Sequence, residues 1–397
     1  MKTGLLFILL LSIGANVSAQ DALVPVSQPA VEVPVTALPA APVEKSAAPV
    51  ATAPPAPEWS WAGDLRLRTQ SEKNGDNHIR WNEKLRLRFG VAVKINPELN
   101  AEIRIATARS NRSTNQALGD SSEPAGTRHF IGLDLAYVNY HPVSFAKLYA
   151  GRIPQIHFRP GGSQVILDED ISLEGTALAS DYTFNEQWRV FLNAGSVYIR
   201  ENYDSYYSVD RTDNMINWAQ AGAEWKIARL KLTAGAGFFN FTGLQGKNYS
   251  DLVTGGTPNG NTEGPTGSVK YPYLPRQYFL EGLWSEDKTS FSLFSERVIN
   301  NEVSDGNSAW WLGAGFTRNS WDGQAAYCEV KPDAVPALFT FSDFANGTAD
   351  ARGVVLSARW KFAKGMSFKV TEFLNRIQAS TNNKQYNRTH LDLNLTF

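Results

Sequence analysis

Cysteine and histidine are scarce in this chain of 397 residues. The single cysteine, Cys328, excludes an intramolecular disulfide. The five histidines are scattered along the sequence: His78, His129, His141, His157 and His390. None has the spacing of a metal site or of a nucleophile with its base. The sequence therefore carries no signature of metal-dependent or nucleophilic catalysis, and it predicts neither a metal nor a cofactor.

Net charge and long apolar runs are also missing. Thirty-eight Lys and Arg residues are balanced by 39 Asp and Glu residues, a net charge of −1 that argues against nucleic-acid binding. The apolar run from Leu5 to Ile13 is far shorter than the roughly 20 residues of a membrane-spanning helix, and no later segment is long enough. If the protein lives in a membrane, strands must cross it, and only a closed barrel satisfies every backbone group in lipid.

The amino terminus has the features of an export signal. Lys2 precedes the apolar run, and Val17-Ser18-Ala19 is a small-residue cleavage site, so residues 1–19 are predicted to be a secretory signal peptide. Residues 20–57 are rich in Ala, Pro and Val, which favours extended polyproline II and predicts a disordered, semi-rigid periplasmic spacer. Contact with the cell wall or a periplasmic partner is the alternative for this spacer. Residues 58–397 remain for one large domain.

The carboxy-terminal segment alternates without a break and ends on Phe397. Its apolar residues are Leu391, Leu393, Leu395 and Phe397, and His390, Asp392, Asn394 and Thr396 take the other parity. Such a strand suits a sheet with lipid on one side and water on the other. For this segment alone, the edge strand of a soluble sandwich explains the pattern equally well.

Similar alternation recurs along the domain and predicts about sixteen strands. They fall near 60–69, 79–95, 99–109, 130–140, 145–153, 171–182, 187–200, 215–227, 229–241, 275–285, 288–299, 308–318, 320–331, 353–363, 365–377 and 387–397. Tryptophans mostly sit near the ends of these strands, as in the interfacial girdles of membrane barrels: Trp59, Trp61, Trp81, Trp188, Trp225, Trp284 and Trp321.

Short and long connections alternate between these strands. The short ones are 96–98, 141–142, 184–186, 228, 286–287, 319 and 364–365, and the long ones are 70–78, 110–129, 154–170, 201–214, 242–274, 300–307, 332–352 and 378–386. This parity is typical of outer-membrane barrels, which have short periplasmic turns and long extracellular loops. We therefore predict an all-β fold, a transmembrane antiparallel up-and-down barrel. A soluble sandwich joined to a linker is the alternative.

On several strands, arginines alternate with the apolar residues that would face lipid. In residues 64–68 and 84–88, leucines alternate with Arg66, Arg68, Arg86 and Arg88, so leucines facing lipid would place the arginines in the lumen. Further lumen cations are predicted at Arg104, Arg359, Lys361, Arg388 and His390. Closure would bring the last strand beside the first and join these residues into one arc. Alternatively, each cation is simply solvated or paired with neighbours such as Asp64, Glu83 and Glu102.

The third long connection, 154–170, is unusually apolar and should pack against something. It contains Pro160-Gly161-Gly162 and ends in Asp168-Glu169-Asp170. At this point the chain resembles the general porins of Gram-negative bacteria. The resemblance lies in the signal peptide and, over residues 58–397, in the strand count, the loop parity, the Ala150-Gly151-Arg152 strand before this loop, and the terminal Phe. The spacer at 20–57 departs from the commonest porins, whose first strand begins almost at the cleavage site.

The resemblance implies specific roles for these residues. The third loop would fold into the barrel and present Asp168, Glu169 and Asp170 as the acidic side of a constriction. Its basic side would be Arg66, Arg68, Arg86, Arg88 and Arg104. Phe397 would be the membrane-insertion signal read by the barrel-insertion machinery. The protein would be a homotrimer in the cell outer membrane, in contact with its lipids and lipopolysaccharide.

The expected function is then passive diffusion of small hydrophilic solutes and ions through a water-filled channel with a charged eyelet. The excess of lumen Arg and Lys also supports an alternative, a substrate-selective channel for anions such as phosphate, sugar acids or an acidic polysaccharide. Two other classes stay open. One is an outer-membrane barrel enzyme such as a lipase or protease, and the other is a surface adhesin that uses residues 242–274.

Overall fold

The computed structural model describes residues 57–108, 113–119, 128–203 and 212–397. The predicted signal peptide lies outside the described residues, as does all of the predicted spacer except Pro57. None of the helices in the described part is both long enough and apolar enough to span a membrane.

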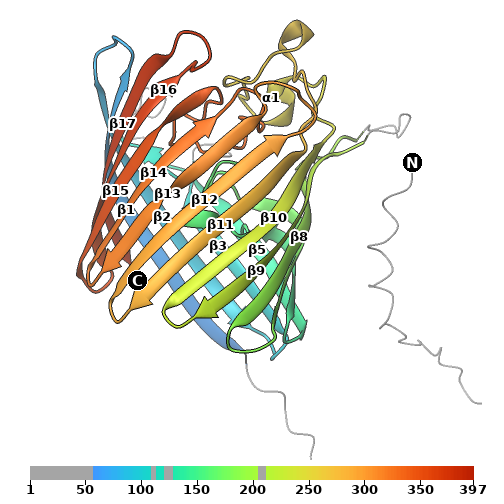
Figure 1. Ribbon diagram of the computed structural model, residues 1–397, viewed down its shortest axis with the longest axis vertical. Helices are drawn as coiled ribbons and strands as arrows, with labels where there is room; N and C mark the ends of the chain where they lie inside the picture. Colours follow the sequence, from blue (N-terminus) through green and yellow to red (C-terminus); the bar gives the residue numbers. More distant parts are fainter. Residues whose placement is uncertain (1–56, 109–112, 120–127, 204–211) are drawn as a thin grey trace, which may run out of the picture. The chain divides into compact units, whose positions relative to one another are not determined.

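Sixteen long antiparallel strands in the described residues form one closed barrel (Figure 1). They are β1 (Glu58–Asn74), β2 (Arg80–Lys94), β3 (Leu99–Thr107), β5 (Ile131–Val143), β6 (Ala146–Ile153), β7 (Leu173–Thr183), β8 (Trp188–Arg200), β9 (Asn214–Ile227), β10 (Leu230–Thr242), β11 (Pro275–Glu286), β12 (Thr289–Asn300), β13 (Ser308–Arg318), β14 (Trp321–Val330), β15 (Ala351–Ala363), β16 (Met366–Ile377) and β17 (Lys384–Thr396). The barrel closes because β1 pairs with both β2 and β17. The predicted fold is confirmed.

The predicted strand bounds agree with the structure to within a few residues, with two informative exceptions. β1 continues to Asn74 and β17 begins at Lys384, so these strands pair well beyond the apolar alternation. The two-residue strand β4 (Gln116–Ala117) was not predicted, because a segment so short carries no alternation. It pairs with Lys84 and Leu85 of β2, beyond the end of the shorter β3.

The predicted face of each side chain is also confirmed on β1, β2 and β17. Arg66 and Arg68 are buried inside the barrel, at 7% and 5% exposure, whereas Leu67 between them is 43% exposed on the outer face. Because successive side chains of a strand point to opposite faces, this observation shows which side chains of β1 face the lumen. The tryptophans of the predicted girdle lie near strand ends, and Trp188 and Trp225 stack on each other with ring centroids 5.9 Å apart.

The connections differ in length between the two ends of the barrel, as predicted (Figure 1). At one end, turns of two to four residues join consecutive strands, and several of the two-residue turns use a residue with positive φ, as at Ala228, Asp287, Asn319 and Gly365. At the other end the connections are longer and include the short helix α1 (Tyr249–Leu252). Which end faces the periplasm stays a prediction.

One side of the barrel interior is filled by an apolar core. Inward aromatic residues of β9, β10, β12 and β13 stack in pairs, Trp218 on Phe239 and Phe294 on Trp311. Two connections pack against them, residues 154–172 between β6 and β7 and residues 331–350 between β14 and β15. We call these the third loop and the seventh loop. The inner faces of β1, β2 and β17 are charged, and they form the polar part of the inner wall beside this core.

Candidate pore constriction

Three neighbouring strands carry the predicted arginines into one cluster. In the observed register, Arg66 lies opposite Arg86 on β2, and Arg68 lies between Asp392 on β17 and Lys84 on β2. This adjacency requires closure, since β17 and β1 are at opposite ends of the domain sequence. The structure thus brings Arg66, Arg68, Arg86, Arg88 and Arg388 onto one part of the inner wall.

Ion pairs within the wall offset the repulsion between these like charges. Asp64 accepts hydrogen bonds from both Arg86 and Arg88, with closest N–O distances of 2.8 and 2.7 Å. Asp392 binds the Arg68 guanidinium at two positions, 2.6 and 3.0 Å. Like charges placed directly opposite each other on a sheet are destabilising, so these carboxylates are needed to keep the arginines side by side.

Arg66 is paired differently from its neighbours. Its Nη2 donates to Asn115, in the connection that also contains β4. Its Nε is buried without a hydrogen-bond partner, and in the described part of the chain no carboxylate forms a salt bridge with it. Arg66 therefore carries the least compensated guanidinium of the cluster.

The sequence did not identify Asp343, which reaches this wall from the seventh loop. Its carboxylate lies 3.3 Å from Arg68 and 3.5 Å from Arg388. Burial tends to raise the pKa of Asp343, but the positive charges around it outweigh burial and hold its pKa well below the usual range. A lone acidic residue gave no sequence signal. The apolar residues near it in the loop, such as Leu338, could have shown that the loop packs inward.

The three predicted acidic residues have different surroundings. Asp168 is buried and accepts backbone N–H bonds from Ser342 at 2.6 Å and from Asp170 at 2.8 Å, so it joins the third loop to the seventh. Burial raises the pKa of Asp168 to about 7, and the neighbouring Asp170 adds to the shift. Glu169 is exposed, and its backbone N–H donates to Gln164.

Asp170 approaches the basic wall. Burial raises its pKa to about 6, with Glu169 and Asp343 adding to the rise, while the charges of Arg66 and Arg86 oppose it. The two arginines are therefore close enough to interact electrostatically with this carboxylate. Of the predicted acidic run, Asp170 is the member whose pKa these two arginines influence. The opposed acidic and basic sides of a constriction stay a prediction.

Backbone contacts hold the third loop against the inner wall. The Gly161 N–H donates to Glu281 on β11 at 2.6 Å, and Gln324 on β14 donates to the Gly161 carbonyl at 2.7 Å. Gly161 has φ +54°, and a Cβ there would lie 2.4 Å from the Phe294 ring, so the close approach requires glycine. Thr340 of the seventh loop donates to the Val165 carbonyl at 2.6 Å. The two loops are thus fixed to the wall and to each other.

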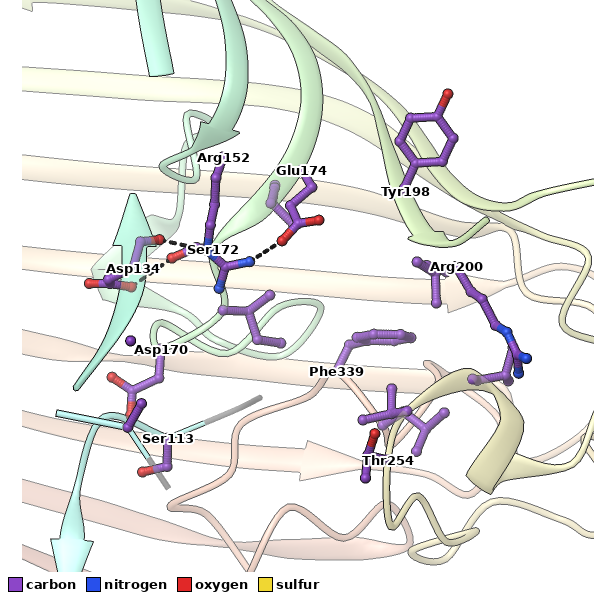
Figure 2. Close-up of a pocket in the computed structure, with 18 of the residues that line it drawn as sticks. Ser113, Asp134, Arg152, Asp170, Ser172, Glu174, Tyr198, Arg200, Thr254 and Phe339 are labelled. Atoms are coloured by element: carbon purple, nitrogen blue, oxygen red, sulfur yellow. Dashed lines mark hydrogen bonds and ion pairs between the residues drawn. The ribbon is translucent and has the colours of Figure 1, made fainter. Parts of the chain in front are cut away.

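A cavity of about 990 Å³ lies beside this constriction, and Figure 2 shows residues that line it. Asp170 is one of them, so the cavity adjoins the acidic end of the third loop. Across it, Arg152 pairs with Glu174, and Ser172 donates to Asp134 at 2.9 Å. The predicted basic residue Arg104 binds the same Asp134 at 2.7 Å, on the β3–β5 part of the wall.

The other predicted lumen cations have separate partners. Arg359 and Lys361 on β15 both bind Asp322 on β14, at 2.8 and 3.1 Å. Arg388 binds Glu72 on β1 at 3.1 Å in addition to Asp343. Within the described residues, no group of three His, Cys, Asp or Glu side chains is arranged to hold a metal ion.

Comparison with known proteins identifies the family of this barrel. No curated protein matches the sequence. Among solved structures, Pseudomonas putida OprB is 10% identical with a TM-score of 0.52, over 85% of this chain and 94% of that chain. Salmonella typhi OmpF in complex with daunomycin is 11% identical with a TM-score of 0.50, over 85% and 97%. The model of the putative porin family matches residues 66–268. This chain, an outer-membrane β-barrel, therefore belongs to the putative porin family.

Proposed function

We propose that this porin-like barrel conducts small hydrophilic solutes and ions by passive diffusion through a charged constriction. The observation that carries the proposal is the arginine cluster of β1, β2 and β17 facing carboxylates from two inward loops, Asp170 and Asp343. Opposed charges across a narrow aqueous passage create a transverse field that favours polar over apolar solutes. Arg66, Arg86 and Arg88 form the basic side in this proposal.

The positive and negative side chains of the constriction nearly balance each other, which supports weak ion selectivity. The arginines of the cluster are accompanied by carboxylates on the wall, Asp64 and Asp392, and on the loops, Asp170 and Asp343. An ion in the passage meets both signs at short range. A strongly selective pore would instead present one sign along its length.

Single-channel recording of the purified protein in a planar bilayer tests this proposal directly. We expect large stepwise openings and a small reversal potential in a salt gradient. A correctly folded barrel that stays silent would reject the channel and return attention to an enzyme or an adhesin. Openings in groups of three would support the proposed homotrimer.

A channel selective for anions or sugar acids is the second candidate. Arg66 favours it, because this guanidinium forms no salt bridge with a carboxylate in the described part of the chain, and its charge can attract the carboxylate or phosphate of a passing solute. A large reversal potential of the sign given by anion flow, with block by a sugar acid, would support it over unselective diffusion.

The remaining parts of the proposal concern assembly. Residues 1–19 direct export and are removed, residues 20–57 form a periplasmic spacer, and Phe397 is read by the barrel-insertion machinery. The barrel then contacts outer-membrane lipids and lipopolysaccharide. Export is checked by the amino-terminal sequence of the mature protein, which we expect to begin at Gln20.

A further inference from the structure

The cavity beside the constriction lies at the end of the barrel where the connections are long. Its wall is formed by the ends of β5, β7 and β8. The third loop, the seventh loop and α1 with the residues that follow it complete the lining. The volume of about 990 Å³ is within the range of sites that hold small organic molecules. The cavity is therefore large enough to bind a solute on its way to the constriction.

Several charged side chains around the cavity are paired with each other. Arg152 pairs with Glu174, and Asp134 binds Arg104 at 2.7 Å. Opposite charges this close largely cancel at the distance of a bound solute. Three other charged side chains of the lining, on the third loop, β8 and α1, form no salt bridge in the described part of the chain.

Asp170 is the acid on the constriction side of the cavity. Its backbone N–H donates to Asp168, but its carboxylate accepts no hydrogen bond from another described residue. Burial raises the pKa of Asp170 to about 6, so this carboxylate is ionised at pH 8, and the charges of Arg66 and Arg86 also favour its ionised form. Asp170 can therefore accept hydrogen bonds from an ammonium group of a solute.

Arg200, the last residue of β8, is the cation of the cavity without an ionic partner. It is exposed, and its Nη1 donates to the backbone carbonyl of Asp251 in α1. The carboxylate of Asp251 accepts a hydrogen bond from Asn248 instead, at 3.2 Å. Because a guanidinium has five N–H donors, Arg200 keeps donors that can bind the carboxylate of a solute.

Apolar side chains line the cavity between these two charges. In Figure 2, Phe339 is drawn between Asp170 and Arg200. Leu252 and Leu338 also belong to the lining. An apolar surface between an acid and a base fits a solute whose own two charges are separated by an apolar part.

We propose that this cavity binds short zwitterionic peptides. The ammonium group of the peptide binds Asp170, its carboxylate binds Arg200, and an apolar side chain packs on Phe339. In a free amino acid both charges are attached to one carbon, whereas an extended peptide separates them by roughly 3.5 Å per residue. The inference names a solute class for the proposed channel and so rests on that function, although binding itself can be measured without conduction.

The presence of both signs distinguishes this site from one for anions or cations alone. A purely anionic solute is repelled by Asp170 and Asp251, and a purely cationic solute is repelled by Arg200. A zwitterion of suitable length meets an opposite charge at each end. Specificity therefore comes from repulsion of the wrong solutes as well as from attraction of the right one.

Isothermal titration calorimetry of the folded barrel in neutral detergent at pH 8 tests the proposal. The probes are the dipeptide Ala-Phe, its N-acetyl form, which lacks the ammonium group, and its C-terminal amide, which lacks the carboxylate. The variants are Asp170→Asn and Arg200→Gln. The matched control is Arg352→Gln, which removes an exposed arginine at the same end of the barrel, on β15 and outside the cavity lining.

We expect wild type to bind Ala-Phe at least about fivefold more tightly than either capped form, because each cap removes a charge-assisted hydrogen bond. Asp170→Asn should lose the discrimination against the N-acetyl form and keep that against the amide. Arg200→Gln should do the reverse. Arg352→Gln should bind all three probes as wild type does.

Equal binding of the three probes by wild type, or no binding, would overturn the proposal, and so would discrimination that survives in both variants. Tighter binding of the amide would make the cavity a cation site, and tighter binding of the N-acetyl form would make it an anion site; each result also overturns the proposal. Planar-bilayer recordings report separately on conduction. A silent barrel that discriminates between the probes contradicts the proposed function alone, whereas a conducting barrel that does not discriminate contradicts the peptide site alone.

Discussion

Arg68 and Asp343 are 275 residues apart in the sequence, and their side chains are 3.3 Å apart inside the barrel. Arg68 belongs to the wall strand β1, whereas Asp343 comes from the seventh loop between β14 and β15, so this ion pair joins the loop to the wall at β1. It also adds a carboxylate to a surface whose other charges come from strands. Asp343 thereby offsets part of the positive charge of the constriction.

Replacing Asp343 with Asn should shift ion selectivity towards anions. A unit charge acts on an ion about 6 Å away in water with roughly 0.7 kcal/mol, which corresponds to about a threefold change in the permeability ratio. Reversal potentials in a KCl gradient measure this ratio. Asp305→Asn, in an exposed loop, is the matched control. An unchanged ratio in Asp343→Asn would remove Asp343 from the constriction.

Neutralising Arg66, Arg86 and Arg88 with Gln should move selectivity in the opposite direction, towards cations. The effect should exceed that of Asp343→Asn, because three charges are lost and Asp64 is left without its two partners. The same reversal-potential measurement applies, after the folded barrel has been verified by circular dichroism. Arg359→Gln with Lys361→Gln tests the cations that bind Asp322 instead. A triple variant with wild-type selectivity would contradict the assignment of the basic side.

Acidification should increase anion preference between pH 8 and pH 5. The pKa of Asp170 is raised to about 6 and that of Asp168 to about 7, so both lose their negative charge in this range, whereas Asp343 stays ionised. Reversal potentials at several pH values measure the change. Asp170→Asn should remove most of this pH dependence, since Asp168 lies between the third and seventh loops. A pH dependence that survives in Asp170→Asn would place the titrating group elsewhere.

The same pKa values predict the direction in which the stability of the fold changes with pH. Both carboxyl groups bind protons more tightly in the folded state than at their ordinary pKa of 3.8. Their favourable contribution is therefore complete below about pH 4 and is lost as the pH rises through 6 and 7. Thermal unfolding of wild type and Asp170→Asn should accordingly differ more at pH 8 than at pH 4, with the variant gaining relative stability at pH 8.

Gly161→Ala should displace the third loop and change the conductance. An added Cβ would lie 2.4 Å from Phe294, and the residue has positive φ. Gly162→Ala is an internal control, because Gly162 also has positive φ but has no atom within 4 Å of an added Cβ. Both variants carry a backbone penalty of about 1–2 kcal/mol, so only the contact differs. We expect altered conductance and more flicker in Gly161→Ala, and nearly normal openings in Gly162→Ala.

Phe397→Ala should reduce the yield of assembled barrel in outer membranes. Phe397 also has a structural place, since its backbone pairs with Gly63 and its ring lies 2.5 Å from where a Gly63 Cβ would be. Gly63→Ala separates the two roles, because it disturbs the ring position without changing the terminal residue. Heat-modifiable mobility on gels of membrane fractions measures assembly. If Gly63→Ala lowers the yield as much as Phe397→Ala, barrel closure rather than a terminal signal explains the loss.

Alternation in the sequence determined the strands, their faces and the parity of the connections, because a period of two is a local property of an extended chain. Leu65, Leu67, Arg66 and Arg68 show their faces without any knowledge of their neighbours. The apolar composition of residues 154–170 likewise indicated that this loop packs inward. Only the tertiary structure decided which charges meet, because pairs such as Arg68 with Asp392 and with Asp343 depend on barrel closure and on the path of a second inward loop. The division of roles within Asp168, Glu169 and Asp170 also came from the fold, since three adjacent acids look equivalent until burial and hydrogen bonds distinguish them.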